Sequence, residues 1–121
     1  VITWADYIPQ ETMFWRRSLW EKVGACLDES YKFALDWELI IRFREQSATF
    51  ARLPRFLGAF RVHPEQKTTS WNSIGQKEMD QLRFRCHQRY ITQAEVNQKT
   101  SSYRKQAWKY YWLDRLNLLG H

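Results

Sequence analysis

The chain has 121 residues and a formal net charge of +6, which suits one domain or part of one. Hydrophobic residues make up 44% and charged residues 26%, proportions that exclude collagen-like, low-complexity and wholly disordered chains. The sequence contains no apolar run of about 18 residues, which excludes a membrane-spanning helix. Aromatic residues make up 17%, so the chain needs a substantial core or a binding surface to cover its rings.

The first part of the chain mixes short elements. Thr12–Arg17 is rich in β formers and predicts a strand. Ser18 is a candidate cap for a short helix over Leu19–Val23, and Gly24 stands just past its end.

A stronger helix is predicted from Leu35 to Gln46. Its apolar residues recur at helical spacing and form one face: Leu35, Leu39, Ile40 and Phe43. Glu38 and Arg42 are four residues apart in the favourable order, so we expect them to pair on the helix surface. Thr49–Leu53 and Arg55–Val62 then read as strands broken at Pro54, and the order of elements predicts an α/β domain over residues 1–69.

Residues 70–121 predict a basic, amphipathic helical extension. Met79, Leu82, Cys86 and Tyr90 give one apolar stripe, and Trp108, Trp112, Leu116 and Leu119 give a second. Residues 97–102 are the expected break between two helices.

The basic excess lies in this extension. Residues 83–121 contain eight Lys and Arg against two acids, whereas residues 1–82 contain eleven of each. This asymmetry is typical of contact with phospholipid, nucleic acid or polyphosphate, and also of a helix face in water. The last helix accordingly fits either a membrane interface near anionic lipid or packing on the rest of the protein.

Two carboxylates mark the start of the Leu35–Gln46 helix. Asp36 lies where backbone amides favour the ionised form, so it is either a helix cap or a general base. Glu38 points to a different side of the helix, so the two do not form a metal pair on one face.

A basic cluster follows the second predicted strand. Arg61 and His63 face the same way in an extended strand, and Lys67 comes soon after. These residues suit a diphosphate, or His63 suits a metal that holds one, although a single His at a strand end also serves structure alone.

Several segments occur together in a characteristic order: Ile8-Pro9-Gln10, Phe14-Trp15-Arg16-Arg17, Trp20 to Gly24, Leu27-Asp28-Glu29, Asp36-Trp37-Glu38-Leu39 with Arg42, and Phe60 to His63 with Gln66-Lys67-Thr68. This progression over residues 8–69 resembles the C-terminal half of family 2 bacterial glycosyltransferases, which have the GT-A fold and invert the sugar configuration. The resemblance implies a partial GT-A-like domain and a role in polysaccharide biosynthesis.

The resemblance also implies roles for individual residues. Asp36 matches the catalytic base, and Glu38 matches the supporting acid of the same motif. The other matched positions line the substrates: Gln10, Trp15, Arg16, Arg42, Arg61 and Lys67. His63 matches a late segment near the diphosphate and a divalent metal, Mg²⁺ or Mn²⁺.

The resemblance lacks one part, because no metal-binding DxD occurs in the sequence. We therefore expect a piece of a larger enzyme, inactive without the donor-binding half and with no tightly bound metal of its own. The implied partners are a nucleotide-sugar and a glycan or lipid-linked acceptor, with a cytoplasmic location at the inner membrane. An open sheet edge would favour a homodimer. The alternative is a non-catalytic basic module that binds membrane or nucleic acid, although no nucleic-acid-binding signature is present.

Overall fold

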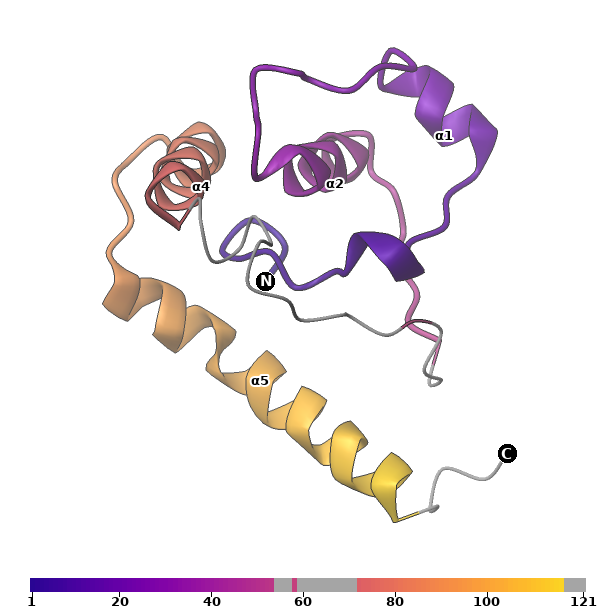
Figure 1. The fold of residues 1–121 in the computed structure, drawn as a ribbon, viewed down its shortest axis with the longest axis vertical. Coiled ribbons are helices and arrows are strands. Elements are labelled where there is room, and N and C mark those ends of the chain that lie inside the picture. The colour runs from indigo at the N-terminus through magenta and orange to yellow at the C-terminus, as the bar shows by residue number, and fades with distance from the viewer. Residues whose placement is uncertain (54–57, 59–71, 117–121) are drawn as a thin grey trace.

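The computed structural model describes residues 1–53, 58 and 72–116. Regular structure in these ranges is entirely helical, as Figure 1 shows. The elements are a 3₁₀ turn η1 (Gln10–Thr12) and the helices α1 (Arg17–Lys22), α2 (Leu35–Glu45), α4 (Asn72–His87) and α5 (Gln93–Arg115). The described ranges contain no strand, so the prediction of an α/β, GT-A-like domain is wrong for them.

The predicted strands fail for a physical reason. Thr12 ends η1, residues 13–16 have no regular structure although Met13 and Arg16 are extended, and Arg17 already begins α1. Residues 49–53 have no regular structure, and Arg55–Val62 lies, apart from Gly58, outside the described residues. A β former stabilises a strand only through a neighbouring strand, and the described part supplies none.

The short helix α1 starts two residues earlier than expected. Its N-cap position is Arg16, and no side chain caps it, so the prediction of Ser18 as cap is wrong. Arg17 Nε instead donates to Glu21 Oε1 at 2.9 Å, one turn on. Gly24 follows the helix with a φ of 91°, a left-handed conformation that glycine adopts readily, as predicted.

Helix α2 occupies the centre of the molecule (Figure 1). Its bounds agree with the predicted helix to one residue, and Leu39, Ile40 and Phe43 are buried as expected. Trp37 and Ile41 are buried as well, so α2 is covered on more sides than its predicted apolar stripe.

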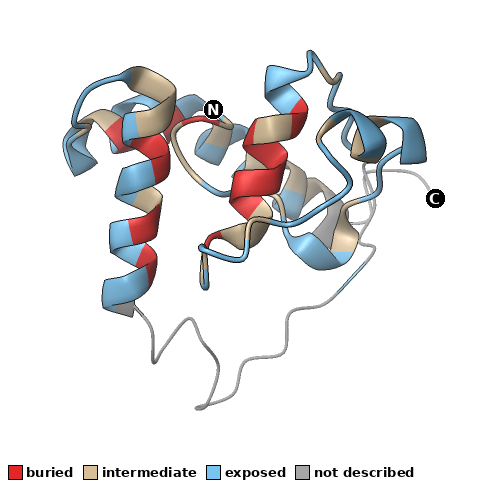
Figure 2. Cartoon of the chain, turned by 90° about the horizontal axis from the view of Figure 1, so that it is seen from above, coloured by how far each residue is buried: buried red, intermediate tan, exposed pale blue. Residues whose placement is uncertain are grey.

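Helix α4 packs beside α2. Leu82 of α4 meets Ala34, Trp37 and Ile41 in the buried core, and Figure 2 shows buried residues concentrated on these two helices. Met79 and Cys86 of the predicted stripe pack against this core; Tyr90 does not and is 85% exposed. Helix α4 is close to the segment before α2 at Gly75, where an added Cβ would lie 2.7 Å from the Phe33 ring.

The break between the last two helices is at residues 88–92, and α5 runs without interruption through the predicted break at 97–102. Gln88 takes a left-handed φ of 54°. Glu95 Oε2 accepts from the backbone N–H of Thr92 at 3.0 Å, and the Glu95 N–H donates to Thr92 Oγ1 at 3.3 Å. This reciprocal pair is a capping box, and it fixes where α5 begins.

One side of α5 packs on the N-terminal segment. The rings of Tyr7 and Tyr103 lie 4.7 Å apart, and Val96 and Thr100 are buried. Within the described ranges, no helix is both long enough and apolar enough to span a bilayer.

Candidate functional site

The indole of Trp37 fixes the N-terminal segment to α2. Trp37 Nε1 donates to the carbonyl oxygen of Ile2 at 2.7 Å, and the ring is 1% exposed. At the end of α4, a ring nitrogen of His87 lies 3.0 Å from the carbonyl oxygen of Thr3. These anchors hold the segment that carries Asp6 beside the start of α2, where the charge of Asp36 acts on Asp6.

Asp36 lies in the first turn of α2. Its Oδ1 accepts a hydrogen bond from the backbone N–H of Trp37 at 2.8 Å, and the residue is half-buried. Burial raises the pKa of the Asp36 carboxyl, the amides of Trp37 and Asp36 lower it, the nearby Glu11 raises it, and the net direction is upward. The backbone amides at the helix start favour the ionised form of Asp36, as expected, but desolvation outweighs their effect.

Asp6 is the second carboxylate of this site, and the sequence analysis gave it no role. Desolvation among surrounding protein atoms and the charge of Asp36 raise the pKa of Asp6 to about 7, against a hydrogen bond from the Ile8 backbone that lowers it. The residue nevertheless keeps access to solvent. No sequence motif indicates this proximity, because it depends on how the N-terminal segment packs.

The charge of Asp36 acts on Asp6 and that of Glu11 acts on Asp36, so we name these three residues the carboxylate cluster. Carboxylates that resist ionisation are stronger bases than ordinary ones once they lose the proton. The raised pKa of Asp36 therefore makes it a stronger base toward a hydroxyl than an ordinary Asp. Across the described part of the chain, no group of three His, Cys, Asp or Glu residues is arranged to hold a metal ion.

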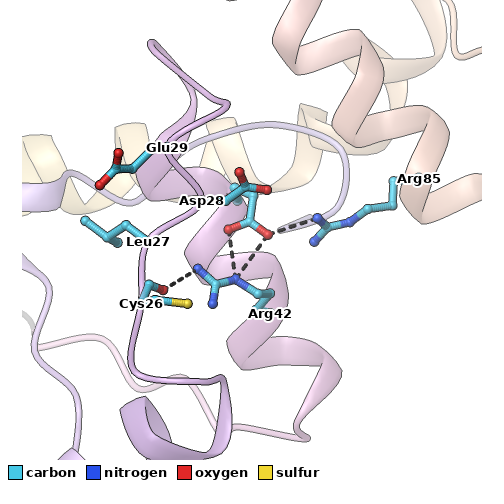
Figure 3. Close-up of a pocket in the computed structure, with 7 residues that line it drawn as sticks. Cys26, Leu27, Asp28, Glu29, Arg42 and Arg85 are labelled. Carbon is cyan, nitrogen blue, oxygen red and sulfur yellow. Dashed lines mark hydrogen bonds and ion pairs between the residues drawn. The ribbon is translucent and has the colours of Figure 1, made fainter.

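Glu38 belongs to a different environment from Asp36. Its carboxylate accepts from Arg42 Nε at 2.8 Å and from Arg85 Nη1 at 2.9 Å, as Figure 3 shows. The predicted pair with Arg42 is present, but the expectation that it lies on the helix surface is wrong, because Glu38 is 1% exposed. Glu38 therefore links α2 to α4.

Arg42 fixes the loop that follows α1. Its guanidinium donates to the carbonyl oxygen of Val23 at 2.8 Å. It also donates to that of Cys26 at 2.9 Å, the bond drawn in Figure 3. These bonds place Asp28 and Glu29 at the rim of an open hollow of about 530 Å³, which Glu38, Arg42 and Arg85 also line. Because its described hydrogen bonds go to Glu38 and to this loop, Arg42 holds the loop against α2.

The other predicted site residues are spread over the surface or fall outside the described residues. Gln10 is exposed in η1, and Arg16 is exposed at the N-cap of α1. Trp15 is 42% exposed, and its ring lies 5.5 Å from that of Phe43. Arg61, His63 and Lys67 lie outside the described residues.

Glu78 is a buried carboxylate that the sequence analysis missed. Its two oxygens accept from the backbone N–H groups of Lys32, Phe33 and Ala34 at 2.8, 2.8 and 2.9 Å. Burial opposes its ionisation, but these amides outweigh burial and lower the pKa of Glu78. Glu78 thus fixes the bend that leads into α2 from a distant part of the chain, where no local spacing reveals it.

A second open hollow, of about 400 Å³, lies where α5 meets the N-terminal segment. Tyr7, Tyr103, Arg104, Ala107, Trp108 and Tyr111 line it. Three of the α5 side chains that line this hollow are aromatic, those of Tyr103, Trp108 and Tyr111.

Comparison of the chain with protein-family models, with curated proteins and with solved structures finds no match.

Proposed function

We propose that this chain is the acceptor-side part of an inverting, nucleotide-sugar-dependent glycosyltransferase, with Asp36 as the general base. The observation that carries the proposal is a half-buried carboxylate of raised pKa in the first turn of α2. It coincides with the position that resembles the family's base in the segment Asp36-Trp37-Glu38-Leu39.

The proposed reaction is a single displacement. Asp36 takes the proton of an acceptor hydroxyl, and the acceptor oxygen forms a bond to the anomeric carbon of the sugar. The bond between that carbon and the diphosphate oxygen breaks, and the nucleoside diphosphate leaves with the electron pair. Burial and the charge of Glu11 both make Asp36 a stronger base than an exposed Asp.

Glu38 takes a positioning role in this proposal. Its oxygens are held by Arg42 and Arg85, so it fixes α2 against α4 and the loop after α1. Asp6 acts beside Asp36 as a second carboxylate whose ionisation is coupled to it.

Donor and metal binding are proposed to depend on residues outside the described ranges. The implied Mg²⁺ or Mn²⁺ would neutralise the leaving diphosphate. The described residues offer no ligand group for it, the sequence has no DxD, and His63 is a candidate ligand outside those ranges. A cytoplasmic location at a membrane surface, where such acceptors are assembled, is part of the proposal.

The test is the substitution Asp36→Asn in the protein that carries this chain together with its donor-binding residues. Asn keeps the shape of Asp but cannot take the proton, so transfer to a pool of glycan acceptors is expected to slow by about 10²- to 10⁴-fold. Donor binding, measured by calorimetry, is expected to persist. Glu21→Gln, which changes an exposed carboxylate on α1, is the matched control and should retain the wild-type rate.

An unchanged transfer rate in Asp36→Asn would refute the assignment of the base. The non-catalytic alternative predicts that result, since a basic binding module makes no use of Asp36.

A further inference from the structure

The outward face of α5 carries large rings and basic groups together. Tyr103 and Tyr110 mark the inward face, because the first contacts Tyr7 and the second lies under the guanidinium of Arg52, 4.8 Å from its ring centre. At about 100° per residue, the opposite face holds Trp108, Trp112 and Leu116 with Lys105 and Lys109.

The apolar groups on this face are open to solvent. Trp108 is 67% exposed, Trp112 is 42% exposed and Leu116 is 60% exposed. The rings of Trp108 and Trp112 contact each other edge to face at 5.6 Å, so they form one continuous projection. The described residues pack on α5 from its other side, as one of the two expectations from the sequence has it, and leave this stripe exposed.

The charge around these rings has a single sign. Arg104, Lys105 and Lys109 are exposed, and residues 96–113 contain no Asp or Glu. Exposed Trp with Lys or Arg on one helix face is the composition of helices that lie in the interface of an anionic bilayer.

We propose that the face of α5 made of Arg104, Lys105, Trp108, Lys109, Trp112 and Leu116 docks on a bilayer that contains anionic phospholipid. The helix lies parallel to the surface, with the indole rings at the depth of the headgroups and the ammonium groups among the phosphates. The inward face keeps its contacts with the N-terminal segment, so the carboxylate cluster stays on the protein side of the helix. This inference does not depend on the proposed transferase activity.

The observations favour a bilayer over two other occupants. A second copy of the same face would bring like charges together, which opposes self-association. Single-stranded nucleic acid binds with bases stacked on open ring faces, whereas the rings of Trp108 and Trp112 contact each other edge to face.

The experiment measures sedimentation of the full 121-residue chain with vesicles. Vesicles of phosphatidylcholine with phosphatidylglycerol are compared with vesicles of phosphatidylcholine alone. We expect binding to the anionic vesicles that falls with added salt, and much weaker binding to the neutral ones.

Two variants test which groups bind. Lys105→Gln with Lys109→Gln should weaken partition onto anionic vesicles by ~30-fold, whereas Lys22→Gln with Lys77→Gln, two exposed lysines elsewhere, should not. The double variant Trp108→Ala, Trp112→Ala should weaken partition onto anionic vesicles by about tenfold or more. Its control, Phe14→Ala with Tyr90→Ala, removes two rings exposed elsewhere and should leave partition unchanged. Circular dichroism checks that each variant keeps the wild-type helix content.

Three results would each overturn the proposal. The first is no binding of the wild type to anionic vesicles. The second is equal loss of binding in the α5 variants and their controls. The third is retention of a single-stranded oligonucleotide, or a concentration-dependent dimer, that requires Trp108 and Trp112 while vesicles are not bound.

Discussion

Asp6 combines access to solvent with a pKa of about 7, well above the ordinary value for an aspartate. A carboxyl whose pKa is raised on folding binds its proton more tightly in the folded state. Folding stability is therefore unaffected below the ordinary pKa, falls as the pH rises toward 7, and stays lower above it. The cost is the free energy of ionising Asp6 where protein atoms desolvate it and the charge of Asp36 repels it.

Asp6→Asn removes this cost, because the amide carries no charge at any pH. The variant is expected to unfold at a higher temperature than the wild type near pH 8, with the difference shrinking as the pH approaches about 4. Thermal unfolding followed by circular dichroism across this range measures it. A difference in unfolding temperature that is the same at every pH would contradict the raised pKa.

Spacing along α2 predicts part of the residue-scale arrangement. Asp36 and Glu38 are two positions apart, which places them on different sides of a helix, and the structure gives them separate partners. Glu38 forms an ion pair with Arg85, 47 positions away along the chain. The charge of Asp36 acts on Asp6, 30 positions before it. Neither pairing follows from periodicity, because both depend on tertiary packing.

At the scale of elements, the bend that leads into helix α2 depends on a side chain of α4. Glu78 accepts the backbone N–H groups of Lys32, Phe33 and Ala34, just before α2, and is 8% exposed. Glu78→Ala leaves these donors without their acceptor, so the free energy of unfolding should fall by about 2–4 kcal/mol.

Urea unfolding near pH 7 measures this loss, and Gln81→Ala at an exposed position of α4 is the control, with an expected change within about 0.5 kcal/mol. Because the pKa of Glu78 is lowered on folding, its contribution is present above the ordinary glutamate pKa and is lost as the pH falls through its folded value. A Glu78→Ala variant as stable as the wild type would show that the amides find other partners.

Some elements were predictable and others were not. Apolar periodicity located α2 to within a residue, because its buried face spans three turns. The start of α5 has a readable local signal, the Thr92 and Glu95 capping box, whereas the polar run at 97–102 suggested a break where the helix continues. Thr12–Arg17 is rich in β formers but forms no strand, because propensity without a partner strand does not make a sheet.

At the scale of the whole molecule, the described chain is a helical assembly around α2, with the N-terminal segment between that core and α5 (Figure 1). The predicted open sheet edge has no counterpart in the described ranges, so the homodimer loses the argument that supported it. The carboxylate cluster and the exposed face of α5 are separate features, and each makes its own prediction.

The central claim is that the start of α2 holds coupled carboxylates that resist ionisation. Carboxyl ¹³C NMR titration of the 121-residue chain tests it directly, with Asp36→Asn as the informative variant and Glu21→Gln as control. We expect Asp36 to titrate above the ordinary aspartate range and Asp6 near 7, and the pKa of Asp6 to fall in Asp36→Asn but not in Glu21→Gln. If both carboxyls titrate as ordinary aspartates and Asp6 does not respond to the loss of Asp36, the cluster does not exist and the proposed base loses its structural support.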